Sequence, residues 1–101
     1  MSKERESATP ETLVDNDRVR VTKWSFKPGE ATGWHVHEYD YVVTPIVGSM
    51  VVMIDGDGKE ANVEMVVGTS YFRQAGVAHD VVNAGAGPLV FVETELKEAR
   101  P

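Results

Sequence analysis

Histidine is the side chain in this sequence with the widest chemical range, because its imidazole can bind metals and exchange protons near neutral pH. His35 and His37 are separated by one residue in the segment GWHVHEYDY. In an extended strand this spacing places both imidazoles on one face, about 7 Å apart, where they can chelate a metal ion. Pairs of this kind also occur on solvated strands without a metal, so the pair alone decides nothing. The chain has no cysteine, which leaves nitrogen and oxygen as metal donors.

A fixed spacing of glycines and histidines surrounds this pair. The pattern G-x5-H-x-H-x3-E-x6-G is reproduced by Gly29, His35, His37 and Gly48, with Tyr41 in the place of the glutamate. Tyr41 has the same strand parity as the two histidines and is therefore expected to point inward with them. Asp40 should point the other way unless a bulge rotates it. Which of the two takes the place of the glutamate stays open.

A second fixed spacing surrounds the third histidine of the chain. The pattern G-x5-P-x-G-x2-H-x3-N is reproduced by Gly68, Gly76, His79 and Asn83, with Gln74 in the place of the proline. Arg73 lies on the short segment that enters this pattern. If its guanidinium points inward, it is suited to bind a substrate carboxylate, and if it points outward it is a solvated or interface charge. Strand parity cannot be followed through the turn at residues 74–76, so both orientations stay open.

Together the two patterns resemble the motifs of the cupin superfamily, in its small, single-domain conserved-barrel type. The resemblance covers residues 14–95 and implies an all-β fold, a double-stranded β-helix or jelly-roll barrel. The segment GWHVHEYDYVV is similar to a subset of bacterial cupins that carry Asp-Tyr where the glutamate normally stands. One member of that subset is associated with β-alanine degradation, and we carry over no reaction from this likeness.

The resemblance also implies a metal site inside the barrel, with His35, His37 and His79 as ligands of one divalent transition metal ion. Three imidazoles suit zinc, iron, nickel or copper better than magnesium or calcium, and the sequence does not separate these four metals. Tyr41 is expected to be a fourth ligand or a hydrogen-bond donor in the site. Because tyrosine is neutral near pH 7, these residues offer the ion no negative charge, and such a site prefers an anionic ligand.

The elements that must position these residues are short β-strands. Apolar residues alternate with period two in runs that Gly, Pro, Asp or Asn interrupt, a pattern typical of an all-β barrel or sandwich. At least seven strands are expected, over residues 18–26, 34–43, 46–54, 61–67, 71–73, 79–83 and 89–95. Pro45 is expected to separate the second strand from the third. Residues 1–12 are interpreted as a flexible N-terminal arm, 13–96 as the barrel and 97–101 as a C-terminal tail.

Composition restricts the possible partners. A chain of 101 residues with 42% hydrophobic and 26% charged residues is typical of one globular domain. The net charge of −6 and the scattered cations argue against nucleic acid. The first twelve residues are polar where a secretion signal needs an apolar stretch, and no run reaches the ~18 apolar residues of a membrane span. We therefore expect a cytoplasmic protein with no membrane partner, and the resemblance implies a homodimer.

Two classes of function fit these observations. The first is a metal-dependent enzyme of dioxygenase or isomerase type that acts on a small anionic metabolite such as a carboxylate, with Tyr41 and Arg73 as catalytic residues beside the ion. The second is a non-catalytic barrel that binds or senses a small molecule, with or without a metal. The sequence identifies no nucleophile and no well-placed carboxylate, so whether the chain is an enzyme stays open.

Overall fold

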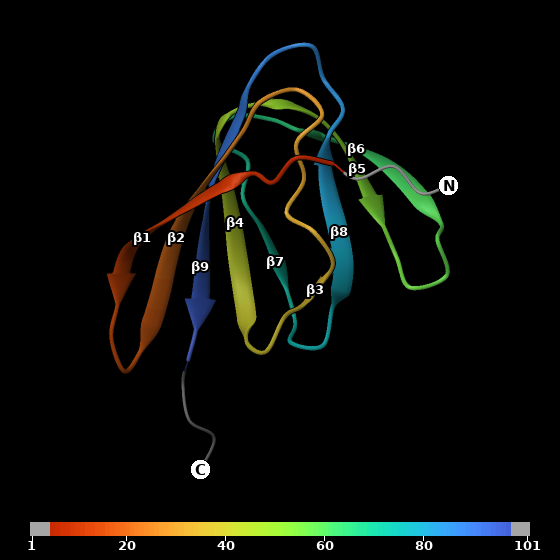
Figure 1. Ribbon diagram of the computed structural model, residues 1–101. Coiled ribbons are helices and arrows are strands. Elements are labelled where there is room, and N and C mark those ends of the chain that lie inside the picture. The colour runs from red at the N-terminus through yellow and green to blue at the C-terminus, as the bar shows by residue number, and fades with distance from the viewer. Residues whose placement is uncertain (1–4, 98–101) are drawn as a thin grey trace.

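The computed structural model describes residues 5–97, and these residues form β-strands and no helix. The all-β prediction is confirmed. Within the same residues there is accordingly no helix that could cross a membrane. The nine strands that the described residues form are β1 (Thr9–Asp15), β2 (Val19–Phe26), β3 (His35–Val36), β4 (Asp40–Val47), β5 (Ser49–Ile54), β6 (Glu60–Met65), β7 (Tyr71–Arg73), β8 (Ala78–Asn83) and β9 (Leu89–Leu96) (Figure 1).

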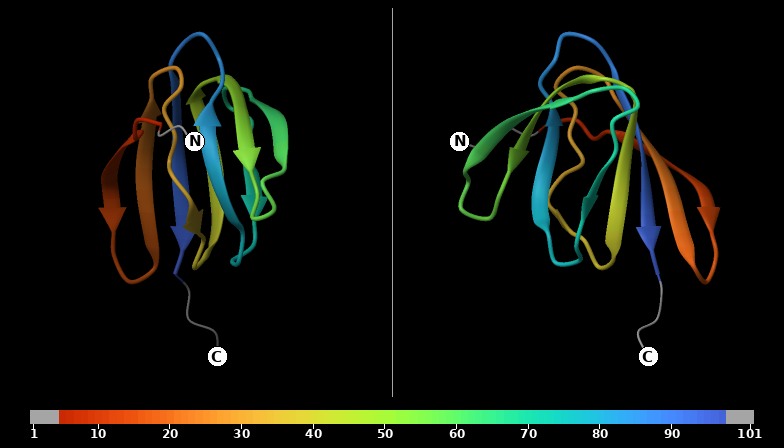
Figure 2. Two further views of the ribbon diagram at one scale, coloured as in Figure 1. Left: turned by 45° about the vertical axis from the view of Figure 1, so that its right-hand side comes forward. Right: turned by 180° about the vertical axis from the view of Figure 1, so that it is seen from behind.

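The strands form two antiparallel sheets that face each other (Figure 2). One sheet has the order β1-β2-β9-β4-β7, and the other has the order β3-β8-β5-β6. From β3 to β5 and again from β6 to β9 the chain crosses between the sheets, so strands that are neighbours in sequence lie on opposite walls. This double-sheet arrangement of crossing antiparallel strands is a jelly roll, as predicted.

The core lies between the two sheets and consists of side chains from the inward positions of both. Phe26 and Phe91 come from paired strands and pack with ring centroids 5.4 Å apart. Burying such apolar side chains contributes about 1.5–3 kcal/mol each and drives the two sheets together. The buried members of this cluster are Ala8, Phe26, Tyr41, Val43, Val51, Met65, Val81, Leu89 and Phe91.

The segment around the HxH pair departs from the predicted strands. One strand was expected over residues 34–43, but β3 ends at Val36 and β4 begins at Asp40 in the other sheet. Pro45, expected between strands, lies inside β4 beside a shift of register, which is a position where the missing N–H of proline is tolerated. The chain instead turns at Gly48, where an added Cβ would lie 2.5 Å from the carbonyl oxygen of Met65.

The first strand also departs from the prediction. Strand β1 begins at Thr9 and pairs with β2, so it overlaps the predicted N-terminal arm over residues 9–12. All seven of its residues are exposed, because it is an edge strand without a covering layer. It therefore lacks the apolar alternation that marks a strand in sequence. Residues 1–4 of the predicted arm and residues 98–101 of the predicted tail lie outside the described residues.

Candidate metal centre

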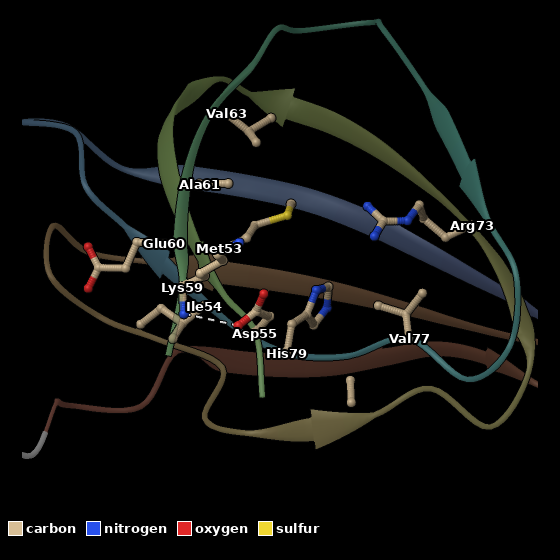
Figure 3. Close-up of a pocket in the computed structure, with 11 residues that line it drawn as sticks. Met53, Ile54, Asp55, Lys59, Glu60, Ala61, Val63, Arg73, Val77 and His79 are labelled. Atoms are coloured by element: carbon tan, nitrogen blue, oxygen red, sulfur yellow. Dashed lines mark hydrogen bonds between the residues drawn. The ribbon is translucent and has the colours of Figure 1, made fainter. Parts of the chain in front are cut away.

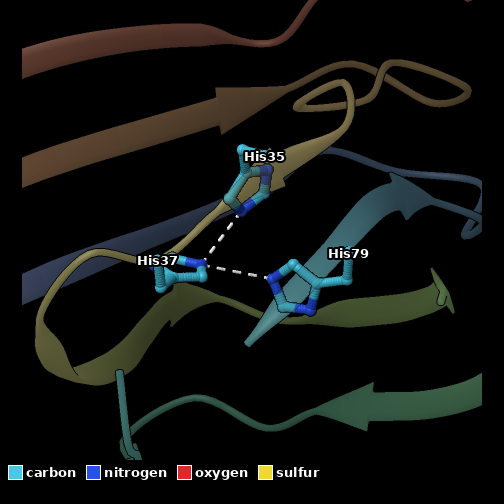
Figure 4. A group of neighbouring side chains, drawn as sticks. All are labelled: His35, His37 and His79. Atoms are coloured by element: carbon cyan, nitrogen blue, oxygen red, sulfur yellow. Dashed lines mark hydrogen bonds between the residues drawn. The ribbon is translucent and has the colours of Figure 1, made fainter. Parts of the chain in front are cut away.

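The three histidines are brought together by the pairing of β3 with β8 and by the loop that follows β3. His35 and His79 are directly opposite each other on the two strands. His37 is fixed by its backbone: its N–H donates to the carbonyl of Val77, and its carbonyl accepts from the N–H of Gly76, both at 2.8 Å. Gly76 has a φ of 102°, which favours glycine and explains this motif position. The imidazoles consequently point toward one another (Figure 4).

The distances between the ring nitrogens fit a shared metal ion. Nε2 of His37 lies 2.9 Å from Nε2 of His35 and 3.3 Å from Nε2 of His79. Two nitrogens bound at about 2.1 Å to one ion are about 3.0 Å apart at a right angle and about 3.4 Å apart at the tetrahedral angle. The observed spacing therefore matches neighbouring positions around a single ion.

The protonation of the rings also fits metal binding. Nδ1 of His35 lies 2.9 Å from the carbonyl oxygen of Gly33, which can only accept, so the proton is on Nδ1 and the lone pair of Nε2 faces the centre. Burial lowers the pKa of His37 to about 3 and that of His79 to about 4, with nearby His35 and Arg73 adding to the effect. Both are neutral at pH 7, the form that binds a metal.

Tyr41 lies beside the histidines, and the carboxylate of Asp40 contacts the turn at residues 74–76. The ring of Tyr41 is 1% exposed and stacks on the imidazole of His37, with centroids 3.8 Å apart and planes 15° from parallel. Its buried hydroxyl has no hydrogen-bond partner among the described groups. Burial raises the pKa of Tyr41 to about 12, so the hydroxyl keeps its proton and remains a donor. The carboxylate of Asp40 accepts from the N–H of Ala75 at 2.8 Å instead.

Arg73 points into a cavity that borders His79. This cavity of about 350 Å³ is bounded by Arg73, His79 and the apolar side chains of Met53, Val63 and Val77, among others. The guanidinium extends inward from β7 toward the same space as His79 (Figure 3). Of the two orientations that the sequence left open, the structure shows the inward one.

Two glutamates on β9 were not identified from the sequence. The side chain of Glu93 is 13% exposed and its Oε2 lies 3.9 Å from Nε2 of His37, while Glu95 lies 3.6 Å from Nη1 of Arg20. Because His37 is neutral at pH 7, its contact with Glu93 is no ion pair. Burial raises the pKa of Glu93 to about 7; nearby Glu95 adds to this, and a hydrogen bond from Trp24 opposes it.

These glutamates line a second cavity together with His35 and His37. It has a volume of about 320 Å³ and is bounded by Trp24, His35, His37, Glu93 and Glu95 together with residues of β1 and β2. The available sequence signal was the alternation along β9, where Glu93 and Glu95 continue the parity of the apolar Phe91. His79 therefore borders a space with Arg73, whereas His35 and His37 border a space with two carboxylates.

Comparisons with known proteins identify the family and support the fold. The profile of the cupin domain matches residues 22–95. The β-alanine degradation protein BauB of Pseudomonas aeruginosa is 46% identical over 93 residues, which cover 92% of this chain and 97% of that protein. The crystal structure of a cupin domain from Bordetella pertussis Tohama I has a TM-score of 0.89 and 40% identity, and the match covers 96% of this chain and 100% of that one. The polyketide cyclase RemF of Streptomyces resistomycificus shares the fold, with a TM-score of 0.69 and 24% identity. The match covers 98% of this chain and 73% of RemF.

Proposed function

The chain belongs to the cupin domain family, and from this premise we propose that it binds one divalent transition metal ion through His35, His37 and His79 and acts on a small carboxylate metabolite. The observation that carries the proposal is the convergence of the imidazole nitrogens, 2.9 and 3.3 Å apart, with His79 at the edge of a cavity of about 350 Å³. Zinc, iron, nickel and copper all suit this donor set.

The residues around the centre have separate tasks in this proposal. When bound, the ion supplies a Lewis acid that polarises an oxygen of the substrate. Arg73 binds the substrate carboxylate, because its planar guanidinium can donate two parallel hydrogen bonds. The buried hydroxyl of Tyr41, which has no partner among the described groups, donates a hydrogen bond to the bound molecule. Both side chains would thus orient the substrate.

The similarity to BauB suggests the size of the metabolite. That protein is named for β-alanine degradation and is 46% identical to this chain. We therefore propose β-alanine and carboxylates of similar size as the compounds to test first. A cavity of about 350 Å³ has room for molecules of this size.

The proposal is tested by titrating small carboxylates into cobalt-loaded protein and following the visible spectrum of the cobalt. We expect binding to change the spectrum, and Arg73→Met to weaken carboxylate binding at least tenfold, because hydrogen bonds to charged groups contribute about 1.5–3 kcal/mol. The matched control is Lys23→Met, which removes a cation of β2 that contacts Glu11 at 3.5 Å and does not line this cavity, and it should leave affinity unchanged. If no small carboxylate changes the spectrum, or if Arg73→Met binds as the wild type does, the proposal is wrong.

Enzyme and binding protein are then distinguished by analysis of the products. A carboxylate that binds and is converted only when the metal is present indicates an enzyme. A carboxylate that binds and is recovered unchanged favours the alternative of a ligand-binding or sensing barrel.

A further inference from the structure

The metal centre proposed above has no carboxylate at the motif position, which Tyr41 occupies. We propose that Glu93 is the carboxylate of this centre and supplies from β9 the negative charge that the motif glutamate would supply from β4. This inference rests on the proposed histidine site. It concerns a residue outside both sequence patterns.

The pairing of the strands places both glutamates of β9 close to the position of the missing glutamate. Strand β4 pairs with β9, with Tyr41 opposite Glu95 and Val43 opposite Glu93. Every second residue of a strand faces inward, so the inward-facing residue of β4 that follows Tyr41 is Val43. Glu93 lies opposite Val43 on the adjacent strand. A carboxylate on β9 can therefore reach the same space as a carboxylate on β4.

The contact with His37 connects Glu93 to the three histidines. Oε2 of Glu93 lies 3.9 Å from Nε2 of His37, and the same nitrogen faces the Nε2 atoms of His35 and His79. The carboxylate therefore faces the nitrogen at the middle of the donor set. Glu93 forms a group of close ligand atoms with His37 and Glu95 that is separate from the group of three histidines, so it can reach an ion bound by the histidines through one water.

The balance of charge favours the same assignment. Three neutral imidazoles and a neutral phenol leave the charge of a divalent ion unbalanced, and a buried carboxylate beside it restores the balance. Conversely, a buried carboxylate is costly unless it is paired. Glu95 has Arg20 at 3.6 Å, whereas Glu93 faces the neutral imidazole of His37 and has a hydrogen bond from Trp24 and, to a smaller extent, the charge of Arg20 to stabilise it. An ion at the histidines and the carboxylate of Glu93 would thus compensate each other.

The inference is tested by measuring zinc affinity through competition with a chromophoric chelator in wild type, Glu93→Gln and Glu95→Gln. We expect Glu93→Gln to bind zinc at least tenfold more weakly and its cobalt form to bind azide more tightly, because negative charge has been lost beside the ion. Gln keeps the size of the side chain and can still accept the hydrogen bond from Trp24. Glu95→Gln is the comparison variant: Glu95 belongs to the same group of close ligand atoms as Glu93 but pairs with Arg20, so its loss should change zinc affinity less than threefold.

Each other outcome overturns the inference. If Glu93→Gln binds zinc as tightly as the wild type, or if Glu95→Gln loses as much zinc affinity as Glu93→Gln, Glu93 has no specific role in metal binding. If His79→Ala loses zinc while Glu93→Gln keeps it, only this inference is wrong, whereas a wild type that binds no metal would contradict the proposed function as well. Should Glu93→Gln not fold, infrared difference spectra of the wild type with and without zinc decide: a shifted carboxylate band supports the inference, and an unchanged band contradicts it.

Discussion

The two halves of β9 differ in chemistry although they share one geometry. In the first half the inward positions hold Leu89 and Phe91, which are 0% and 3% exposed and belong to the core. In the second half the inward positions hold Glu93 and Glu95, which border the histidine centre. The same alternation thus builds an apolar half of the barrel and a polar half.

The neighbouring strand β2 changes in the same way and shows what the two halves do. Phe26, opposite Leu89, is in the core, while Arg20, opposite Glu95, lies beside the carboxylates. Apolar burial in one half provides the free energy of folding, which offsets the cost of placing polar groups inside the other half. Substitutions in the apolar half should therefore change stability, and substitutions in the polar half should change binding.

The largest expected effect on stability lies in the apolar half, at Phe91. Phe91→Ala should lower the free energy of unfolding by about 3–5 kcal/mol, because it removes a buried ring and leaves a cavity. The folded fraction should still bind metal. Urea unfolding followed by fluorescence measures this, with the exposed Val67→Ala as a control expected to change stability by less than about 0.5 kcal/mol. A loss below about 1 kcal/mol at Phe91 would contradict the division into two halves.

A smaller loss of stability is expected on substitution of Asn83, a polar residue in the apolar half. Its side-chain oxygen accepts from Ser49 at 2.7 Å and from Gly85 at 3.1 Å, and its amide donates to the carbonyl of Gly87 at 2.9 Å. Asn83→Ala should lower the free energy of unfolding by about 2–3 kcal/mol, because buried groups lose their partners. Metal affinity, measured in the same samples, should not change. A selective loss of metal with normal stability would assign Asn83 to the site instead.

The smallest effect on stability is expected on substitution of Tyr41 in the polar half, and it is an increase. Its buried hydroxyl has no partner among the described groups, so Tyr41→Phe should raise the stability of the metal-free protein by about 1 kcal/mol. Carboxylate binding to the cobalt form should weaken. The half-buried Tyr39→Phe serves as the control, with little change expected in either measurement. A destabilised Tyr41→Phe protein would show that the hydroxyl stabilises the fold.

The sequence predicted the fold and the clustering of the three histidines through the resemblance of its two spaced patterns to the cupin motifs. The two patterns contain all three histidines, and short strands such as β7, expected over residues 71–73, follow from alternation and turns. Strand β1 was missed because all of its residues are exposed. Glu93 was missed because its contact with His37 depends on which strands pair, and the strand spacing in sequence does not reveal this.

The orientation of Arg73 shows a second limit of sequence reasoning. Parity cannot be followed through the turn at residues 74–76, and the inward direction follows from the pairing of Arg73 with Tyr41 across β7 and β4. The predicted homodimer and cytoplasmic location depend on other molecules and stay predictions.

The central claim is that the three histidines bind one metal ion. Elemental analysis of untagged protein purified without chelators tests it most directly, in the wild type and in His35→Ala and His79→Ala. The account predicts one ion per wild-type chain and its loss in both variants, with all three proteins folded. A wild type that contains no ion, and takes up none when zinc, iron(II), nickel or copper is added, would contradict it.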